Sequence, residues 1–63
     1  MTATLEQVRG ALAANRPAEA DRLATAIEAE AFAGRKVQVL AAVWPLLADA
    51  RRQRRARAAG GRI

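Results

Sequence analysis

Residues 37–50 read Val37-Gln38-Val39-Leu40-Ala41-Ala42-Val43-Trp44-Pro45-Leu46-Leu47-Ala48-Asp49-Ala50 and hold the densest group of large apolar side chains in the chain. At about 100° of rotation per residue, these side chains form two neighbouring stripes of a helix. The stripes are, first, Val37, Leu40, Trp44 and Leu47 and, second, Val39, Val43 and Leu46. Together they cover about half of the helix circumference, wider than the ~100° stripe of a surface helix. We therefore predict a helix from about Lys36 with more apolar surface than one packing partner covers.

Two such stripes predict two packing partners. The rest of the chain is expected to cover one stripe, and the other is expected to meet a second copy or a different protein. The predicted protein interface is Val39, Val43, Trp44 and Leu46. Trp44 suits either the core or the centre of an interface, where Trp is a frequent anchor. Pro45 removes one backbone amide and crowds the preceding turn, so a kink or a restart of the helix near Trp44 is predicted.

A first helix is predicted to begin at Thr4, because Thr4 and Gln7 have the spacing of a capping box. In that motif each of the two side chains bonds to the backbone amide of the other residue. One apolar helical stripe follows, formed by Leu5, Val8 and Leu12. Asn15 tolerates a left-handed backbone conformation, so we expect the first helix to stop there.

A second helix is predicted over residues 17–33, because Pro17 suits the first turn of a helix and Gly34 is a natural stop. Its apolar face is narrow and rich in small residues, which permits close packing against another helix. This face consists of Ala20, Leu23, Ala24, Ile27 and Ala31. Phe32 lies almost opposite that face and is expected to cap the following turn or to contact a partner.

The predicted fold is all-α: a small helical hairpin, and a third, Pro-kinked helix that runs into a basic C-terminal arm. We expect a helical body over residues 1–50 and an Arg-rich arm over residues 51–63. Eighteen of the hydrophobic residues are alanine, so few large side chains remain to build a core. A chain this short buries only about 60% of its unfolded surface. A homo-oligomer or membership of a larger complex is therefore expected.

The C-terminal arm carries six arginines and no acid, whereas the first fifty residues carry five basic and six acidic residues. The formal net charge of +5 is thus a body of −1 and an arm of +6. A concentrated block of arginines suits a polyanion. The predicted phosphate-contacting residues are Arg51, Arg52, Arg54, Arg55 and Arg57. Two alternatives are docking on an acidic protein surface and a solvated terminus that partly caps the third helix.

The inventory of side chains argues against catalysis, since the sequence contains no Ser, Cys, His or Tyr. No metal site, cofactor or disulfide is predicted either. The longest mostly apolar run, residues 37–48, is short of the ~20 residues that span a bilayer, and the N-terminus lacks the pattern of a secretory signal. We expect a cytoplasmic protein, or one inside a virion assembled there, and no membrane partner.

These features together predict a non-catalytic helical adaptor. It would associate through the apolar third helix and bind DNA or RNA through the phosphate backbone, with little sequence specificity. The alternative is a structural or accessory subunit of a larger assembly, such as a phage virion or a ribonucleoprotein or polymerase complex. In that case the arm would dock on an acidic protein surface. The Ala- and Arg-rich, Lys-poor composition suggests a bacterial or phage genome of high GC content.

Overall fold

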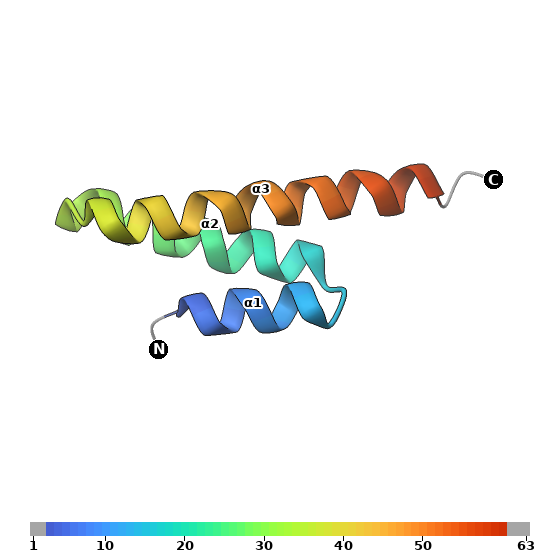
Figure 1. The fold of residues 1–63 in the computed structure, drawn as a ribbon, viewed down its shortest axis with the longest axis horizontal. Helices are drawn as coiled ribbons and strands as arrows, with labels where there is room; N and C mark the ends of the chain where they lie inside the picture. The colour runs from blue at the N-terminus through green and yellow to red at the C-terminus, as the bar shows by residue number, and fades with distance from the viewer. Residues whose placement is uncertain (1–2, 61–63) are drawn as a thin grey trace.

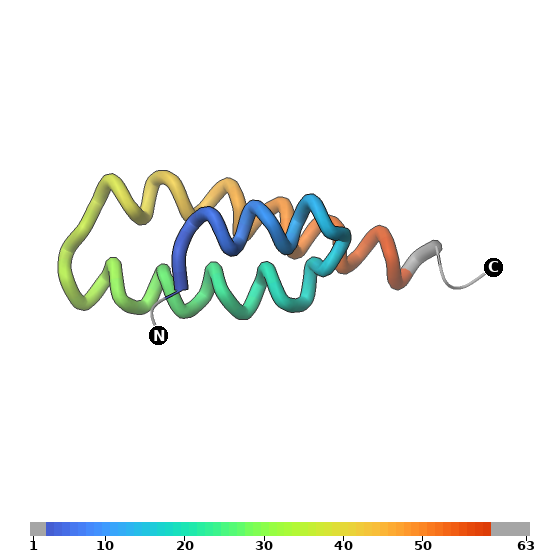
Figure 2. Tube along the Cα trace, turned by 90° about the horizontal axis from the view of Figure 1, so that it is seen from below, coloured from blue at the N-terminus to red at the C-terminus, as the bar shows by residue number. Residues whose placement is uncertain are grey.

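The computed structural model describes residues 3–60, with the side chains of residues 59 and 60 excepted, and this part of the chain forms three helices (Figure 1). They are α1 (Leu5–Ala13), α2 (Pro17–Gly34) and α3 (Val37–Gly60). Consecutive helices run antiparallel, and α1 packs against both α2 and α3 (Figure 2). No strand occurs within residues 3–60, so the predicted all-α fold is confirmed.

The predicted ends of α1 are confirmed. The Thr4 hydroxyl accepts a hydrogen bond from the Gln7 amide at 3.2 Å, and the Thr4 amide donates to Gln7 Oε1 at 3.0 Å, which completes the capping box. At the other end Asn15 has a φ of 61°. The amide of Arg16 then donates back to the carbonyl of Ala11 at 2.8 Å. This bond closes the helix in the way that a left-handed C-terminal residue allows.

The predicted stop of α2 at Gly34 is one residue early. Gly34 is still helical, and the left-handed conformation falls on Arg35, with φ 54° and ψ 40°. The register is set by the amide of Lys36, which donates to the carbonyl of Ala31 at 2.8 Å. This closing bond requires a left-handed residue just before Lys36, where the sequence supplies an arginine and not the glycine.

We predict that Arg35→Gly stabilises the protein by about 1 kcal/mol, because a side chain in the left-handed region costs roughly 1–2 kcal/mol and glycine avoids most of that cost. Urea unfolding followed by circular dichroism measures the change. Arg9→Gly is the control: Arg9 lies inside α1 and is exposed, and glycine there should destabilise by about 1 kcal/mol. A destabilising Arg35→Gly would show that the arginine side chain contributes more than its backbone strain costs.

The predicted restart of the helix near Trp44 does not occur, because α3 continues through Pro45 without a break. Proline at this position leaves the carbonyl of Ala41, four residues earlier, without its helical donor. Ala41 and Pro45 are both exposed. Water can therefore satisfy that carbonyl, and the helix tolerates the proline on its solvent side.

The core is built mainly from alanine on α2 and from larger side chains on α1 and α3. Its buried members are Val8, Ala11, Ala20, Ala24, Ile27, Val43, Leu47 and Ala50. The predicted narrow face of α2 is confirmed, with Ala20 and Ala24 at 0% exposure and Leu23 half-buried. Small side chains on this face bring the backbones of α2 and its neighbours close together, so the core leaves no room for larger groups.

We predict that Ala24→Leu lowers the free energy of unfolding by about 1–3 kcal/mol, since extra methylene groups in a packed core force neighbouring side chains apart. Ala26→Leu is the matched control, because Ala26 lies on the exposed side of the same helix and should change stability by no more than about 0.5 kcal/mol. Equal effects of the two substitutions in urea unfolding would contradict a tight α2 core.

Candidate nucleic-acid interface

The predicted C-terminal arm is the continuation of α3. The boundary expected at residues 50 and 51 falls inside this helix, which has 24 residues against the 18 of α2. At about 1.5 Å per residue, α3 is longer than α2 by roughly 9 Å, and its C-terminal turns extend past the start of α2 (Figure 1). The arm is packed on one side: Ala50 is buried, Gln53 is half-buried, and Gln53 Oε1 is enclosed without a hydrogen-bond partner among the described residues.

Two arginines of the arm face the body, and we call them the inner arginines: Arg54 and Arg57. They continue the helical spacing of the buried residues Leu47 and Ala50. Arg54 Nη1 donates to Asp21 Oδ2 at 2.8 Å, and Arg57 Nη1 donates to the carbonyl oxygen of Asn15 at 3.0 Å. The inner arginines therefore fasten the end of α3 to the start of α2 and to the turn before it.

The other three predicted phosphate contacts lie on the solvent side, and we call them the outer arginines: Arg51, Arg52 and Arg55. All three are exposed. Arg51 Nε is 4.0 Å from the Asp21 carboxylate, and Arg52 pairs with Asp49 of the preceding turn. The pair with Asp21 is long, and the pair with Asp49 is exposed on both sides, so the guanidinium groups of Arg51 and Arg52 remain accessible to a phosphate.

Asp21 is the anchor for this end of the molecule. Its side chain is only 15% exposed, although it carries a charge. Besides the two arginines, Thr25 Oγ1 lies 3.2 Å from Asp21 Oδ1 and 2.8 Å from the Asp21 carbonyl oxygen. A carboxylate in such a position is held by charge-assisted hydrogen bonds, which are stronger than neutral ones.

Two arginines that were not among the predicted phosphate contacts complete the basic surface. A hollow around the start of α2 is lined by Arg16, Pro17, Ala18, Glu19, Arg22, Arg54 and Arg57. Arg16 and Arg22 are distant from the arm in sequence, and the antiparallel packing of α2 and α3 brings them to it. The predicted start of the second helix at Pro17 could have indicated this proximity. In an antiparallel arrangement, the end of the third helix lies beside the start of the second.

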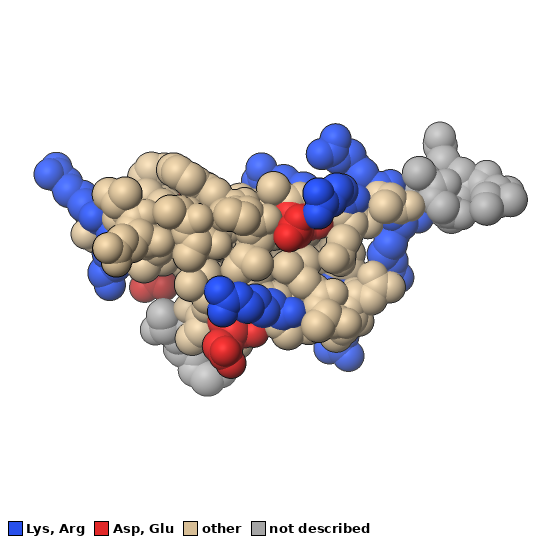
Figure 3. Space-filling model, in the orientation of Figure 1, with Lys and Arg blue, Asp and Glu red and all other residues tan. Residues whose placement is uncertain are grey.

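Charge is segregated along the molecule as a result. The end formed by the start of α2 and the last turns of α3 holds seven arginines against three acids, a balance of +4. These residues are Arg16, Arg22, Arg51, Arg52, Arg54, Arg55 and Arg57 against Glu19, Asp21 and Asp49. The remaining charged residues among 3–60 balance to zero. Figure 3 shows basic side chains gathered over the C-terminal half of α3, beside an uncharged N-terminal half.

The predicted protein interface is only partly at the surface. Val43 is 0% exposed within the single chain, and Val39 and Leu46 are half-buried against the core. The prediction that this stripe faces outward is therefore wrong, because α1 and α2 both pack on α3 and the inward side lies between the two stripes. Trp44, in contrast, is 47% exposed. Two large apolar residues outside the predicted interface set are also exposed: Phe32 at 58% and Val37 at 72%.

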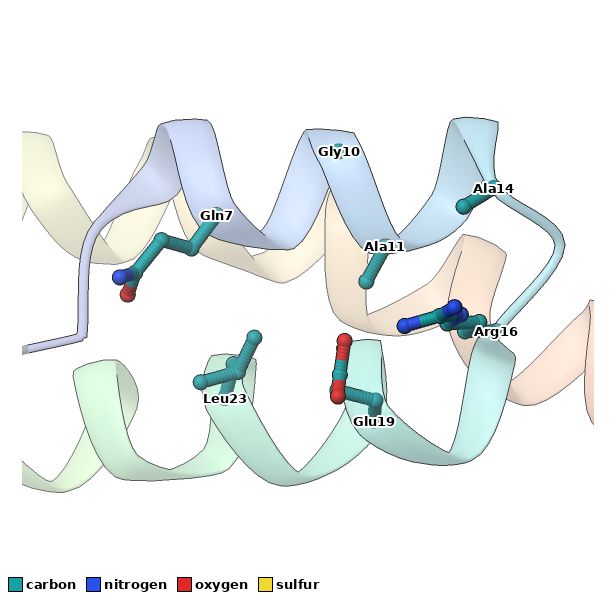
Figure 4. Close-up of a pocket in the computed structure, with 7 residues that line it drawn as sticks. All are labelled: Gln7, Gly10, Ala11, Ala14, Arg16, Glu19 and Leu23. Atoms are coloured by element: carbon teal, nitrogen blue, oxygen red, sulfur yellow. The ribbon is translucent and has the colours of Figure 1, made fainter.

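A second hollow lies between α1 and α2 (Figure 4). It is lined by Gln7, Gly10, Ala11, Ala14, Arg16, Glu19 and Leu23. The side chains of Leu23 and Glu19 point across it towards α1 (Figure 4). Its ionisable groups are one arginine and one glutamate.

Other classes of site are not found among the described residues. Within residues 3–60 no three side chains of metal-ligating type come together. No helix in the described part of the chain has the length and apolar character needed to cross a membrane. Comparison of the chain with protein-family models, curated proteins and solved structures finds no match. Function is therefore inferred from the chemistry of the surface itself.

We predict that Asp21 and Arg54 are energetically coupled by roughly 0.5–1 kcal/mol, because the aspartate is mostly shielded from water while the arginine is half exposed. A double-mutant cycle with Asp21→Ala and Arg54→Ala, measured by urea unfolding, gives the coupling. The pair Asp49 and Arg52 is the control: its side chains are 41% and 75% exposed, so its coupling should be close to zero. The reverse order would show that Asp21 does not anchor the arm.

Proposed function

We propose that the protein is a small non-catalytic module that binds nucleic acid through the phosphate backbone, using the basic end formed by α2 and α3. The observation that carries the proposal is the convergence of seven arginines, from α3, α2 and the residue before α2, at one end of a molecule 44 Å long. Charge of one sign gathered in this way attracts a polyanion and orients its approach.

The type of cation supports phosphate as the target. Arginine offers a planar fork of donors that matches two phosphate oxygens, and it stays charged at any physiological pH. The start of α2 adds the positive end of a helix dipole beside Arg16 and Arg22. Phosphates would contact the outer arginines and the hollow around the start of α2. Arg54, which lines that hollow, would keep its hydrogen bond to Asp21.

Little sequence specificity is expected of such binding. Contacts to phosphate fix the position of a protein on nucleic acid but do not distinguish bases. The side chains of α3 that could reach base edges are few, because its exposed residues between Val37 and Ala48 are almost all apolar. The proposed module therefore recognises charge and backbone.

We predict that the triple variant Arg51→Glu, Arg52→Glu, Arg55→Glu binds a short labelled duplex at least about tenfold more weakly, measured by fluorescence anisotropy over a range of salt concentrations. Each phosphate contact contributes about 0.9 to the slope of log affinity against log salt. The slope should therefore fall by roughly 2–3 units.

The matched control is Arg9→Glu, Arg35→Glu, Lys36→Glu, which changes the net charge equally outside the basic end, on α1 and at the turn between α2 and α3. Its salt slope should stay close to that of the wild type. Equal weakening by both triple variants would show that net charge alone governs binding. Absence of duplex and single-strand binding in the wild type, together with binding to polyglutamate, would favour docking on an acidic protein surface and contradict the proposal.

A further inference from the structure

The outer side of α3 carries a continuous strip that begins apolar and ends basic. Its members recur at intervals of three, four or seven residues, so they share one side of the helix. The strip consists of Val37, Ala41, Trp44, Ala48, Arg51 and Arg55, and each of them is exposed. It is turned by about 100° around the helix from the buried residues Leu40, Val43, Leu47 and Ala50, so its side chains stay at the surface while those four form the core.

Trp44 of this strip lies against a second aromatic ring, that of Phe32 from α2. Their ring centroids are 6.3 Å apart and their planes are inclined by 55°, a geometry typical of attractive aromatic pairs. Trp44 Nε1 donates to Glu28 Oε2 at 2.7 Å. The hydrogen bond and the ring contact fix the orientation of the indole, and 47% of Trp44 remains exposed. We call these two residues the aromatic platform.

The outer arginines follow the aromatic platform at distances set by the helix. At about 1.5 Å per residue, Arg51 lies roughly 10 Å and Arg55 roughly 16 Å along the axis from Trp44. Rigid aromatic surface next to a row of cations is the combination that binds single strands: bases stack on the rings and phosphates follow the charge. A duplex keeps its bases stacked inside and can use only the charge.

We infer that this strip is a binding site for single-stranded nucleic acid, with a base stacked on the aromatic platform and the neighbouring phosphates on Arg51 and Arg55. The inference rests on the proposed function and narrows its ligand from nucleic acid in general to unpaired strands.

A second copy of the chain fits the strip less well. Antiparallel pairing of two α3 helices about Trp44 sets Arg51 and Arg52 opposite Val37 and Lys36, and parallel pairing sets the outer arginines against each other. Both arrangements bring like charges together or leave them against apolar groups. The charge pattern instead favours an anionic ligand.

The size of the apolar part also disfavours a protein partner. From Val37 to Ala48 the strip is about 17 Å long and, on a helix about 10–12 Å wide, covers roughly 200 Å². A stable protein interface needs about 800 Å² on each side. Stacking of one base, in contrast, needs only the area of a ring.

The sequence supplies its own probe, because Trp44 is the only tryptophan. The wild-type chain is titrated with oligothymidylate and with a duplex of the same length, following both tryptophan fluorescence and anisotropy. We expect the single strand to bind more tightly than the duplex and to quench Trp44, as stacking requires. Phe32→Ala and Trp44→Leu, followed by anisotropy, should each weaken single-strand binding about tenfold and leave duplex binding within about twofold.

The outcomes separate the two proposals. Equal affinity for single strand and duplex, with Trp44 fluorescence unchanged, overturns the single-strand site and leaves the proposed function standing. No binding of either nucleic acid overturns both. A dimer in light scattering that Trp44→Leu converts to a monomer assigns the strip to self-association and overturns the site. Circular dichroism verifies that each variant is folded, and Phe32→Ala, at an exposed position, serves if Trp44→Leu unfolds the chain.

Discussion

The close approach of α2 and α3 is the constraint on which the rest of the structure depends. Alanines along α2 set a short distance between the two backbones, and the turn at Arg35 and Lys36 fixes their register. In an antiparallel pair, contacts move along the two helices in opposite directions. The observed contacts do so: Glu28 meets Trp44, and Asp21 meets Arg54. One packed interface thus orients both the aromatic platform and the inner arginines, which lie at different points along it.

The same interface resolves the electrostatic difficulty of an arginine-rich helix. Like charges three or four residues apart destabilise an isolated helix by roughly 0.2–0.5 kcal/mol per pair, so the arm alone would be a weak helix. In the folded chain the carboxylate of Asp21 accepts a hydrogen bond from Arg54, and the carbonyl oxygen of Asn15 accepts a hydrogen bond from Arg57. Anchoring of the inner arginines offsets the repulsion, and the outer arginines then stand on an ordered helix. Ordered cations lose less entropy on meeting phosphates than those on a loose tail.

Features that depend on a few neighbouring residues could be predicted from the sequence, whereas features that depend on tertiary packing could not. The capping box at Thr4 and the left-handed Asn15 involve hydrogen bonds over a few residues, and both were predicted correctly. The narrow face of α2 was also predictable, because its small side chains leave one possible inward side. The two apolar stripes on α3 left two possible inward sides, and the sequence did not decide between them. Val43 lies in the core because α1 and α2 share the covering of α3, and no local pattern states where two helices sit. Arg16 and Arg22 escaped notice for the same reason, since only tertiary packing brings them to the arm.

Helical phase separates the roles of neighbouring residues on α3. Arg54 and Arg55 are adjacent in sequence, yet Arg54 donates to Asp21 while Arg55 is exposed and only lines the hollow beside that pair. Val43 and Trp44 divide in the same way, one at 0% and the other at 47% exposure. A rotation of about 100° per residue is enough to put neighbours on the inner and the outer side. On the proposed function, the outer side carries the arginines that meet the ligand while the inner side maintains the fold. A small core and an exposed surface of rings and arginines can share one helix because the buried and the exposed side chains lie on different sides of it.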